Sequence, residues 1–321
     1  MTPAESPAPP GEPAPPWGDA LSGGLPEPEP VSDGGAGPAE PVLVELPCPP
    51  PAGADAWRPY PSDAEGGHTV VGDVRVLEGF YSPELDRCRD VVVYLPPSYR
   101  SGGGPYPVVY MHDGQNLFDE AAAFAGEWGV DETMEALAQD GLEAIVVGID
   151  NGGARRLDEY SPFQDAEGRG GDGDRYLAFL TDTLKPRIDA DLRTLPGREH
   201  TAVAGSSMGG LISLYAFLRR PDVFGKAAVM SPSLWFAGRA VFETVEATPY
   251  APGRVYLGVG LSEGAETVAD ARRLRDLLLA KGYRRRRDLL YLEQRGAGHS
   301  EAAWRRRFRY AARFLLRPEA P

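Results

Sequence analysis

The stretch TAVAGSSMGGLISLY, residues 201–215, indicates how this chain folds. An apolar run ends at two serines enclosed by glycines, and a second apolar run with a helical pattern follows. Gly205, Ser207 and Gly209 fit the pattern G-x-S-x-G, which needs a strand before it and a helix after it. Glycine has no Cβ, so the chain can turn sharply there in strained backbone. We therefore predict a strand, a tight turn and a helix, with Ser207 at the tip and Ser206 as a turn residue.

Apolar and amphipathic segments alternate on both sides of this stretch. Strand-like apolar runs lie at residues 107–113, 143–150, 226–232, 254–260 and 288–294. Helical patterns lie between or after them, at residues 131–139, 174–188, 266–282 and 300–316. Two earlier β-rich segments, residues 69–82 and 89–99, are expected to pair antiparallel. The alternation predicts an α/β fold, with a mostly parallel sheet, antiparallel N-terminal strands and helices on both faces.

The first 66 residues differ in composition from the rest. Proline, glycine, alanine and acidic residues dominate there, which is typical of a disordered arm. The arm holds eleven acidic residues and one basic residue, and so carries −10 of the net charge of −14. We predict an arm at residues 1–66 and a nearly neutral catalytic domain at residues 67–321. Because the chain carries a net negative charge, we expect no nucleic-acid partner.

Apolar runs, cysteines and arginine runs indicate the cellular compartment and the exposed basic surfaces. We expect no secretory signal, because no basic and then apolar region follows Met1, and no apolar run is long enough to cross a membrane. Cys48 and Cys88 lie far apart, so we expect no structural disulfide and a cytoplasmic location. The arginine runs at residues 284–287 and 305–307 are interpreted as solvated faces.

A nucleophilic serine at the turn would need a base and an acid from other strand ends. Ligands bind beyond the carboxyl ends of parallel strands. Among the four histidines, His299 alone has both the required edge and the order serine, acid, histidine. His112 as the base is the competing interpretation. Glu263, three residues beyond the strand at 254–260, is the preferred acid, and Glu266 and Asp270 stay open as alternatives.

Oxyanion donors and pocket walls are expected at the same edge. The backbone N–H of Met208 opens the helix, and that of Gln115 lies in the loop after the strand at 107–113. The segments 148–162 and 230–236 follow two further strands and are interpreted as pocket walls. The pocket residues predicted from these loops are His112, Asp113, Asn151, Arg156, Tyr160 and Trp235.

Six motifs carry a resemblance to a known family: VYLPPSY, YMHDGQNLF, GIDNG with RLDEYSP, AGSSMGGLISLY, MSPSLWF and GAGHSEAAW. Over about residues 70–317 the chain resembles the putative esterase family of α/β-hydrolases. That family includes enterochelin and ferri-bacillibactin esterases, feruloyl and acetylxylan esterases, and S-formylglutathione hydrolase. The resemblance implies the α/β-hydrolase fold, catalytic roles for Ser207 and His299, and, less firmly, a role for Glu263. The acidic arm is not part of the family pattern.

The expected activity is that of a serine carboxylesterase with no metal and no cofactor, acting on a small ester through an acyl-enzyme. A thioesterase or acyltransferase would use the same residues. A hydrolase-fold binding protein without turnover is the alternative from another class. The sequence does not specify the ester or the oligomeric state.

Overall fold

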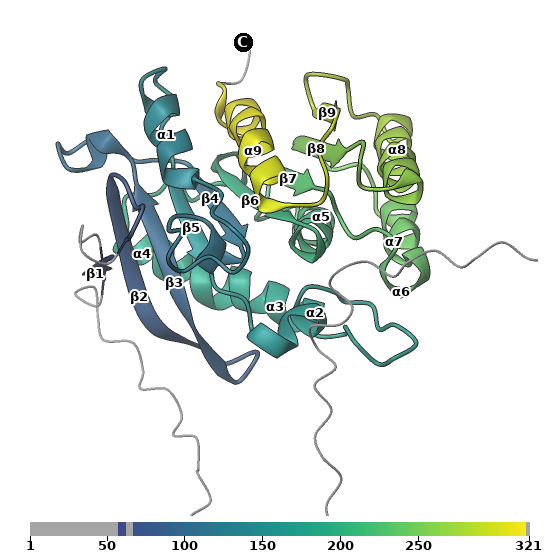
Figure 1. Cartoon of the computed structure of the whole chain (residues 1–321), viewed down its shortest axis with the longest axis horizontal. Helices are drawn as coiled ribbons and strands as arrows, with labels where there is room; N and C mark the ends of the chain where they lie inside the picture. Colours follow the sequence, from purple (N-terminus) through teal and green to yellow (C-terminus); the bar gives the residue numbers. More distant parts are fainter. Residues whose placement is uncertain (1–56, 62–66, 319–321) are drawn as a thin grey trace, which may run out of the picture. The chain divides into compact units, whose positions relative to one another are not determined.

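The computed structural model describes residues 57–61 and 67–318. It contains a single nine-stranded sheet in the order β1-β2-β3-β5-β4-β6-β7-β8-β9 (Figure 1). The strands are β1 (Arg58–Pro59), β2 (Asp73–Ser82), β3 (Arg87–Leu95), β4 (Val108–His112), β5 (Ile145–Ile149), β6 (Thr201–Ser206), β7 (Lys226–Met230), β8 (Arg254–Gly260) and β9 (Leu289–Gln294). β1, β2 and β3 are antiparallel, β3 pairs antiparallel with β5, and the strands from β5 to β9 are parallel. This confirms the predicted fold class.

The helices between the strands are mostly short. The α-helices are α1 (Val130–Ala138), α2 (Arg156–Glu159), α3 (Gly173–Ala178), α4 (Lys185–Asp191), α5 (Met208–Arg219), α6 (Phe236–Arg239), α7 (Val241–Ala247), α8 (Ala265–Ala280) and α9 (Glu301–Leu316). The other turns are the 3-10 segments η2 (Pro97–Tyr99), η3 (Gly114–Asn116), η4 (Gly153–Arg155) and η6 (Arg198–His200), and the π-helical segment η5 (Phe179–Leu184).

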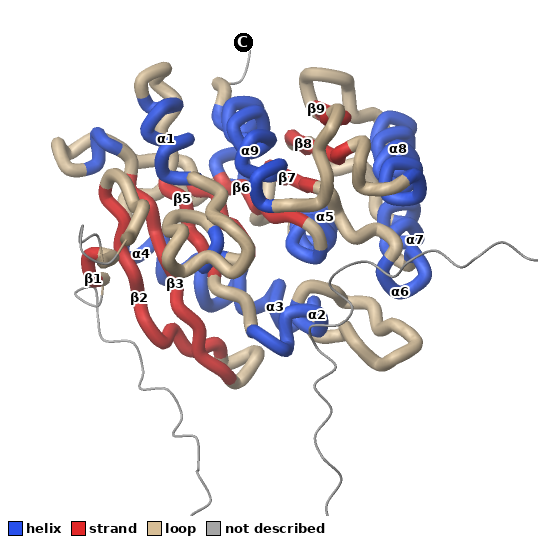
Figure 2. Tube along the Cα trace, viewed as in Figure 1, coloured by secondary structure: helices blue, strands red, loops and turns tan. Residues whose placement is uncertain are grey.

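Both faces of the sheet are covered, as Figure 2 shows for the strands and the helices around them. On β3, Val91 and Val93 belong to the core on one face, and Val92 belongs to the core on the other. The first core is closed by α3, η5, α4, α5, α7 and α8, and the second by α1 and α9. A strand buried on both faces must be apolar along its whole length. That requirement explains the continuous apolar runs in the sequence.

The helix predicted at residues 174–188 is interrupted. The structure has α3, then the π-helical turn η5, then α4, which continues past Pro186 to Asp191. Proline inside a regular α-helix loses a hydrogen bond and clashes with the preceding turn. Here Pro186 lies in the first turn of α4, directly after η5, where the regular hydrogen-bond ladder is already broken.

Residues 57–61 were predicted as part of the arm, and for them the prediction is wrong. β1 pairs with β2, and the indole Nε1 of Trp57 donates to Asp191 at 2.8 Å. For residues 1–56 and 62–66, which lie outside the described residues, the arm stays a prediction. Cys88 on β3 is disulfide-bonded, against expectation. The cytoplasmic location was inferred partly from the expected absence of a disulfide, and disulfides are uncommon in the cytoplasm. That location therefore stays a prediction.

Candidate active site

Ser207 lies at the turn between β6 and α5. Its backbone angles are φ 56° and ψ −123°, which a non-glycine residue rarely adopts. Its N–H donates to the carbonyl of Met230 at 3.0 Å, which ties the turn to the end of β7. A Cβ on Gly205 would lie 2.7 Å from the carbonyl carbon of Gly209 and 2.9 Å from the ring of His112. Close packing therefore requires a glycine at position 205, the first of the pattern G-x-S-x-G.

Ser207 is partly exposed and faces the loop that follows β7. Its Oγ lies 3.3 Å from the Oγ of Ser233, and the Ser233 N–H donates to the Ser207 carbonyl at 3.0 Å. Ser231, at the start of the same loop, is fully buried. The loop therefore contacts Ser207 through Ser233 and enters the protein interior at Ser231.

His299 and Glu263 are paired. The Nδ1 of His299 lies 3.0 Å from the Oε2 of Glu263. The histidine side chain is 29% exposed and the carboxylate 1% exposed. The alternative acids are held elsewhere, since Glu266 and Asp270 both accept hydrogen bonds from Arg239. The structure therefore brings Glu263 to His299, and places Glu266 and Asp270 against an arginine.

The second oxygen of Glu263 is held just as firmly. Its Oε1 accepts hydrogen bonds from the Oγ of Ser231 at 2.6 Å, the N–H of Gly260 at 2.7 Å and Arg307 at 3.2 Å. Burial alone would raise the pKa of Glu263. The hydrogen bonds from His299, Ser231 and Gly260 outweigh burial and hold that pKa below its usual value. Glu263 is therefore ionised at neutral pH.

Ser231 is a junction for three side chains. Its Oγ donates to Glu263 and accepts from the Nε1 of Trp304 at 3.0 Å and from Arg307 at 2.9 Å. A hydroxyl has one donor and two acceptor positions, and all are used here. The ring of Trp304 also meets the ring of His299 edge-on, with centroids 4.9 Å apart. Ser231, Trp304 and Arg307 therefore position both Glu263 and His299.

Arg307 was missed by the sequence analysis. The run at residues 305–307 was interpreted as a solvated face, and for Arg307 this is wrong because it is fully buried. Its spacing from Trp304 and Phe308 places it beside the apolar stripe of α9, and this spacing could have identified it. Ser231 was interpreted as a pocket wall, but it is buried behind Glu263.

The loop after β4 packs against the turn at Ser207. Asp113 has left-handed backbone (φ 58°), and its side chain lies close to Gly209. Arg156 donates to both its oxygens, at 2.6 and 2.8 Å, and the Nδ2 of Asn151 donates at 2.7 Å. Burial would raise the pKa of Asp113, but Arg156 lowers it. Gln115 lies in η3 of this loop, and its Oε1 accepts from the N–H of Asn151 at 3.4 Å.

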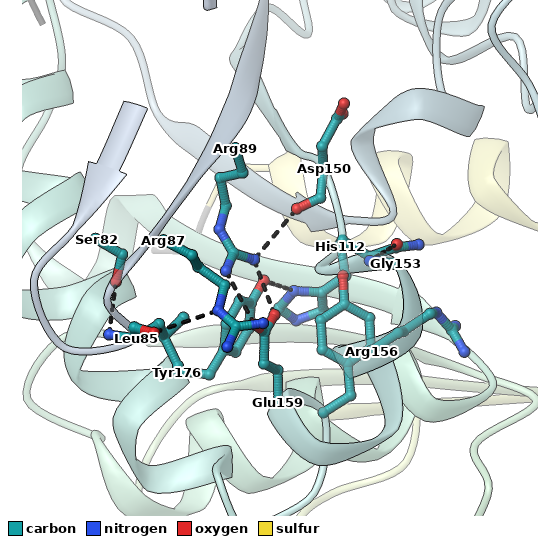
Figure 3. A network of polar contacts seen from close by, with 12 residues as sticks. Ser82, Leu85, Arg87, Arg89, His112, Asp150, Gly153, Arg156, Glu159 and Tyr176 are labelled. Atoms are coloured by element: carbon teal, nitrogen blue, oxygen red, sulfur yellow. Dashed lines mark hydrogen bonds and ion pairs between the residues drawn. The ribbon is translucent and has the colours of Figure 1, made fainter. Parts of the chain in front are cut away.

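A second network is centred on Glu159, and Figure 3 shows this residue beside Arg87 and Arg89, with His112 and Tyr176 nearby. Arg89 donates to both oxygens of Glu159, at 3.0 and 3.2 Å. The Nδ1 of His112 lies 2.9 Å from the hydroxyl of Tyr176. Burial lowers the pKa of His112 to about 3, so this histidine stays neutral. Its position in the core makes His112 a poor candidate for the base.

The remaining predicted pocket residues differ in exposure. Tyr160 is fully buried, and its hydroxyl accepts the N–H of Asp113 at 3.1 Å, so it supports the loop. Trp235 is 46% exposed at the start of α6 and stays the best candidate for contact with substrate. Met208 begins α5 directly after Ser207.

A large cavity lies away from these residues. It has a volume of about 720 Å³ and surrounds the amino ends of β7 and β8, at Lys226 and Arg254. Three arginines of the run at 284–287 line it. None of the predicted catalytic residues lines this cavity. The candidate site is therefore located by the hydrogen bonds at the carboxyl ends of the strands and not by cavity size.

Comparisons with known proteins identify the family of this chain. Residues 82–315 match the model of the family described as "Putative esterase". Uncharacterized protein YbbA of Bacillus subtilis is 33% identical over 199 residues, which are 59% of this chain and 75% of that protein. The iron(III) salmochelin esterase of Escherichia coli O6:H1 is 26% identical over 245 residues, 70% of this chain and 54% of the relative. This chain thus spans about half the length of that esterase.

A solved structure shows the same fold. The crystal structure of the BES protein from Bacillus cereus aligns with a TM-score of 0.64 at 19% identity, covering 80% of this chain and 100% of that chain. In the part of the chain that the structure describes, no helix is long and apolar enough to cross a membrane.

Proposed function

Because the chain belongs to the putative esterase family, we propose that it is a serine hydrolase that cleaves a carboxylic ester, with Ser207, His299 and Glu263 as its catalytic triad. The observation that supports this most is the pair formed by His299 Nδ1 and Glu263 Oε2 at 3.0 Å. The pair follows β8 and β9, on the edge where Ser207 follows β6. A histidine whose Nδ1 is bound to a buried carboxylate presents Nε2 as the base.

The proposed reaction has two halves. In the first, His299 removes the proton of Ser207 while the serine oxygen attacks the ester carbonyl, and the backbone N–H groups of Met208 and Gln115 stabilise the oxyanion. The protonated histidine then gives its proton to the leaving alcohol, which leaves an acyl group on Ser207. In the second half, His299 activates a water that attacks the acyl carbonyl, and Ser207 regains its proton as the acid leaves.

Glu263 keeps the catalytic histidine in one tautomer and stabilises the imidazolium that forms. Its ionised state fits this role, because it accepts hydrogen bonds on both oxygens and its pKa is lowered. Asp113 and Arg156 are proposed to hold the oxyanion loop against Gly209, and not to bind substrate, because they are occupied with each other.

The substrate is proposed by analogy with the relatives. The similarity to the iron(III) salmochelin esterase points to siderophore esters as one class. Arg156 is already paired with Asp113, so it does not offer an uncompensated cation to an anionic ligand. Exposed Trp235 instead offers an apolar surface near the end of β7. We therefore expect an ester with an aromatic or aliphatic acyl group and little negative charge.

The first test is hydrolysis of p-nitrophenyl esters from acetate to decanoate, beside an enterobactin-type trilactone. The purified protein is compared with Ser207→Ala and with the neighbouring control Ser206→Ala, each checked for folding by circular dichroism. We expect Ser207→Ala to lower kcat on the order of 10⁶-fold, as in serine proteases, and Ser206→Ala to keep most activity. Equal activity in the wild type and Ser207→Ala, or no activity in folded wild type on any ester, would contradict the proposal.

A further inference from the structure

A second group of carboxylates lies outside the candidate active site. Glu127, Asp131 and Glu132, here called the acid cluster, lie at and just before the start of α1. Asp131 is 0% and Glu127 5% exposed, and Glu132 is partly buried. One oxygen from each residue lies within 4.8 Å of the other two. Carboxylates repel each other at such distances, so something must compensate their charge.

Each member of the acid cluster has one fully buried oxygen with no hydrogen-bond donor in the described residues. These are Oε1 of Glu127, Oδ1 of Asp131 and Oε2 of Glu132. An ionised oxygen that is buried without a donor destabilises the folded state. These buried oxygens without a donor point to a missing ligand, because the carboxylates of an ordinary acidic patch are exposed and hydrated.

The other oxygens of the acid cluster are bound to three separate segments. Asp131 Oδ2 accepts the N–H of Val71 at 2.7 Å, and Glu127 Oε2 accepts the hydroxyl of Thr69 at 2.9 Å. Arg305 of α9 donates to Glu132 Oε1 at 3.2 Å and lies 3.7 Å from Glu127 Oε2. Within residues 57–61 and 67–318, Arg305 is the one cation that forms ion pairs with the acid cluster, and its side chain is 44% exposed. Three carboxylates therefore face one half-exposed guanidinium.

We propose that the acid cluster binds a hard divalent cation, Ca²⁺, as a structural site. Calcium takes six to eight oxygen ligands at about 2.3–2.6 Å, so one ion can touch oxygens up to roughly 4.8 Å apart. Magnesium is usually bound through one or two carboxylates and keeps most of its water. The cluster has no histidine or cysteine, which disfavours zinc and copper. Three carboxylates and a few waters suit calcium best.

The cation would join three parts of the fold. The segment at residues 69–71, the start of α1 and Arg305 on α9 meet at the acid cluster. Trp128, next to Glu127, packs against Trp304 with ring centroids 5.7 Å apart. Trp304 in turn contacts Ser231 and His299. The ion would therefore stiffen the wall behind the candidate triad without touching it.

A shared proton is the competing way to neutralise the acid cluster. Burial, a hydrogen bond with Glu132, and the charges of Glu132 and Glu127 raise the pKa of Asp131 to about 8. A protonated Asp131 would relieve the repulsion with no ion bound. The experiment must therefore separate a response to a cation from a response to protonation alone.

The test uses the full chain, stripped with a chelator and then dialysed at pH 7.5. We expect Ca²⁺ at about 100 times its Kd to raise Tm by roughly 5–10 °C. Tb³⁺, a calcium substitute, should give luminescence on tryptophan excitation, because Trp128 adjoins the site. Asp131→Asn and Glu127→Gln should abolish both signals. Asp140→Asn, which removes an exposed acid paired with Arg313 just beyond α1, is the matched control and should keep them.

Arg305→Gln should have the opposite effect on Ca²⁺ binding to that of the two cluster variants. It removes the cation that competes with the ion, so Ca²⁺ should bind more tightly. The proposal is overturned if neither Ca²⁺ nor Tb³⁺ gives a signal with folded wild type, or if both cluster variants respond like Asp140→Asn. A response to Mg²⁺ without one to Ca²⁺ would overturn the assignment to calcium.

Discussion

Two buried carboxylates in this molecule have opposite environments. Glu263 accepts hydrogen bonds on both oxygens, including one from the buried Arg307, and its pKa is lowered. Asp131 is equally buried but has one oxygen with no donor and two carboxylate neighbours, and its pKa is raised. Burial opposes ionisation in both cases, so the partners alone decide the difference. The protein supplies a complete set of donors at the candidate active site and an incomplete one at the acid cluster.

After Ser207→Ala, the largest effect should come from replacing the acid of the candidate triad. Glu263→Gln keeps the shape but allows the wrong histidine tautomer, and we expect kcat to fall by about 10⁴, as for the equivalent change in serine proteases. Ester hydrolysis at saturating substrate measures this. Glu266→Gln and Asp270→Asn are the controls, because both acids bind Arg239. A larger loss in either control would move the triad acid to that residue.

Removing the cation behind Glu263 should mainly affect stability. Arg307→Met leaves a buried carboxylate with one donor fewer, and we expect a loss of about 3–5 kcal/mol in unfolding free energy. Arg307→Lys should lose less, since it keeps the charge. Urea denaturation with circular dichroism gives both values. If Arg307→Met unfolds with the same free energy as the wild type, the ionised form of Glu263 does not depend on the arginine.

The pH dependence of stability should differ between wild type and Glu263→Gln. The pKa of Glu263 is lowered on folding, so its ionised form contributes stability above the unfolded value of about 4.3. That contribution is lost as pH falls through the lower, folded pKa. The difference in unfolding free energy between the two proteins should therefore be constant near pH 7 and shrink below about pH 4. A difference that does not change with pH would show that the charge of Glu263 contributes nothing to the free energy of unfolding.

The smallest effect, and one of opposite sign, is expected at the acid cluster. In chelator, Asp131→Asn removes a repulsive charge and should stabilise the fold, on the order of 1 kcal/mol. Thermal unfolding in EDTA measures it, with Asp140→Asn as the control. Destabilisation of Asp131→Asn in EDTA, with the control unchanged, would mean that the protein compensates this carboxylate by itself.

Much of the fold could be predicted because local patterns carry it. The apolar runs at 107–113 and 201–206 became β4 and β6, and the glycines around Ser207 became the turn. The break at η5 could not be predicted, because a π-helical turn leaves no periodic signal. Residues 57–61 were misassigned for a related reason: a two-residue strand is held by its partner β2 and by Asp191, and its own composition is that of an arm.

The sequence by itself determined the strand-turn-helix at Ser207, the chain order of Ser207, Glu263 and His299, and the edge of the sheet at which all three follow a strand. These follow from steric rules and strand order. Only the tertiary structure decided that Glu263, and not Glu266 or Asp270, pairs with His299. It also decided that Arg307 is buried behind that pair and that three carboxylates converge beside α1. The charge and partners of a buried group depend on residues far away in the chain, and no local pattern records them.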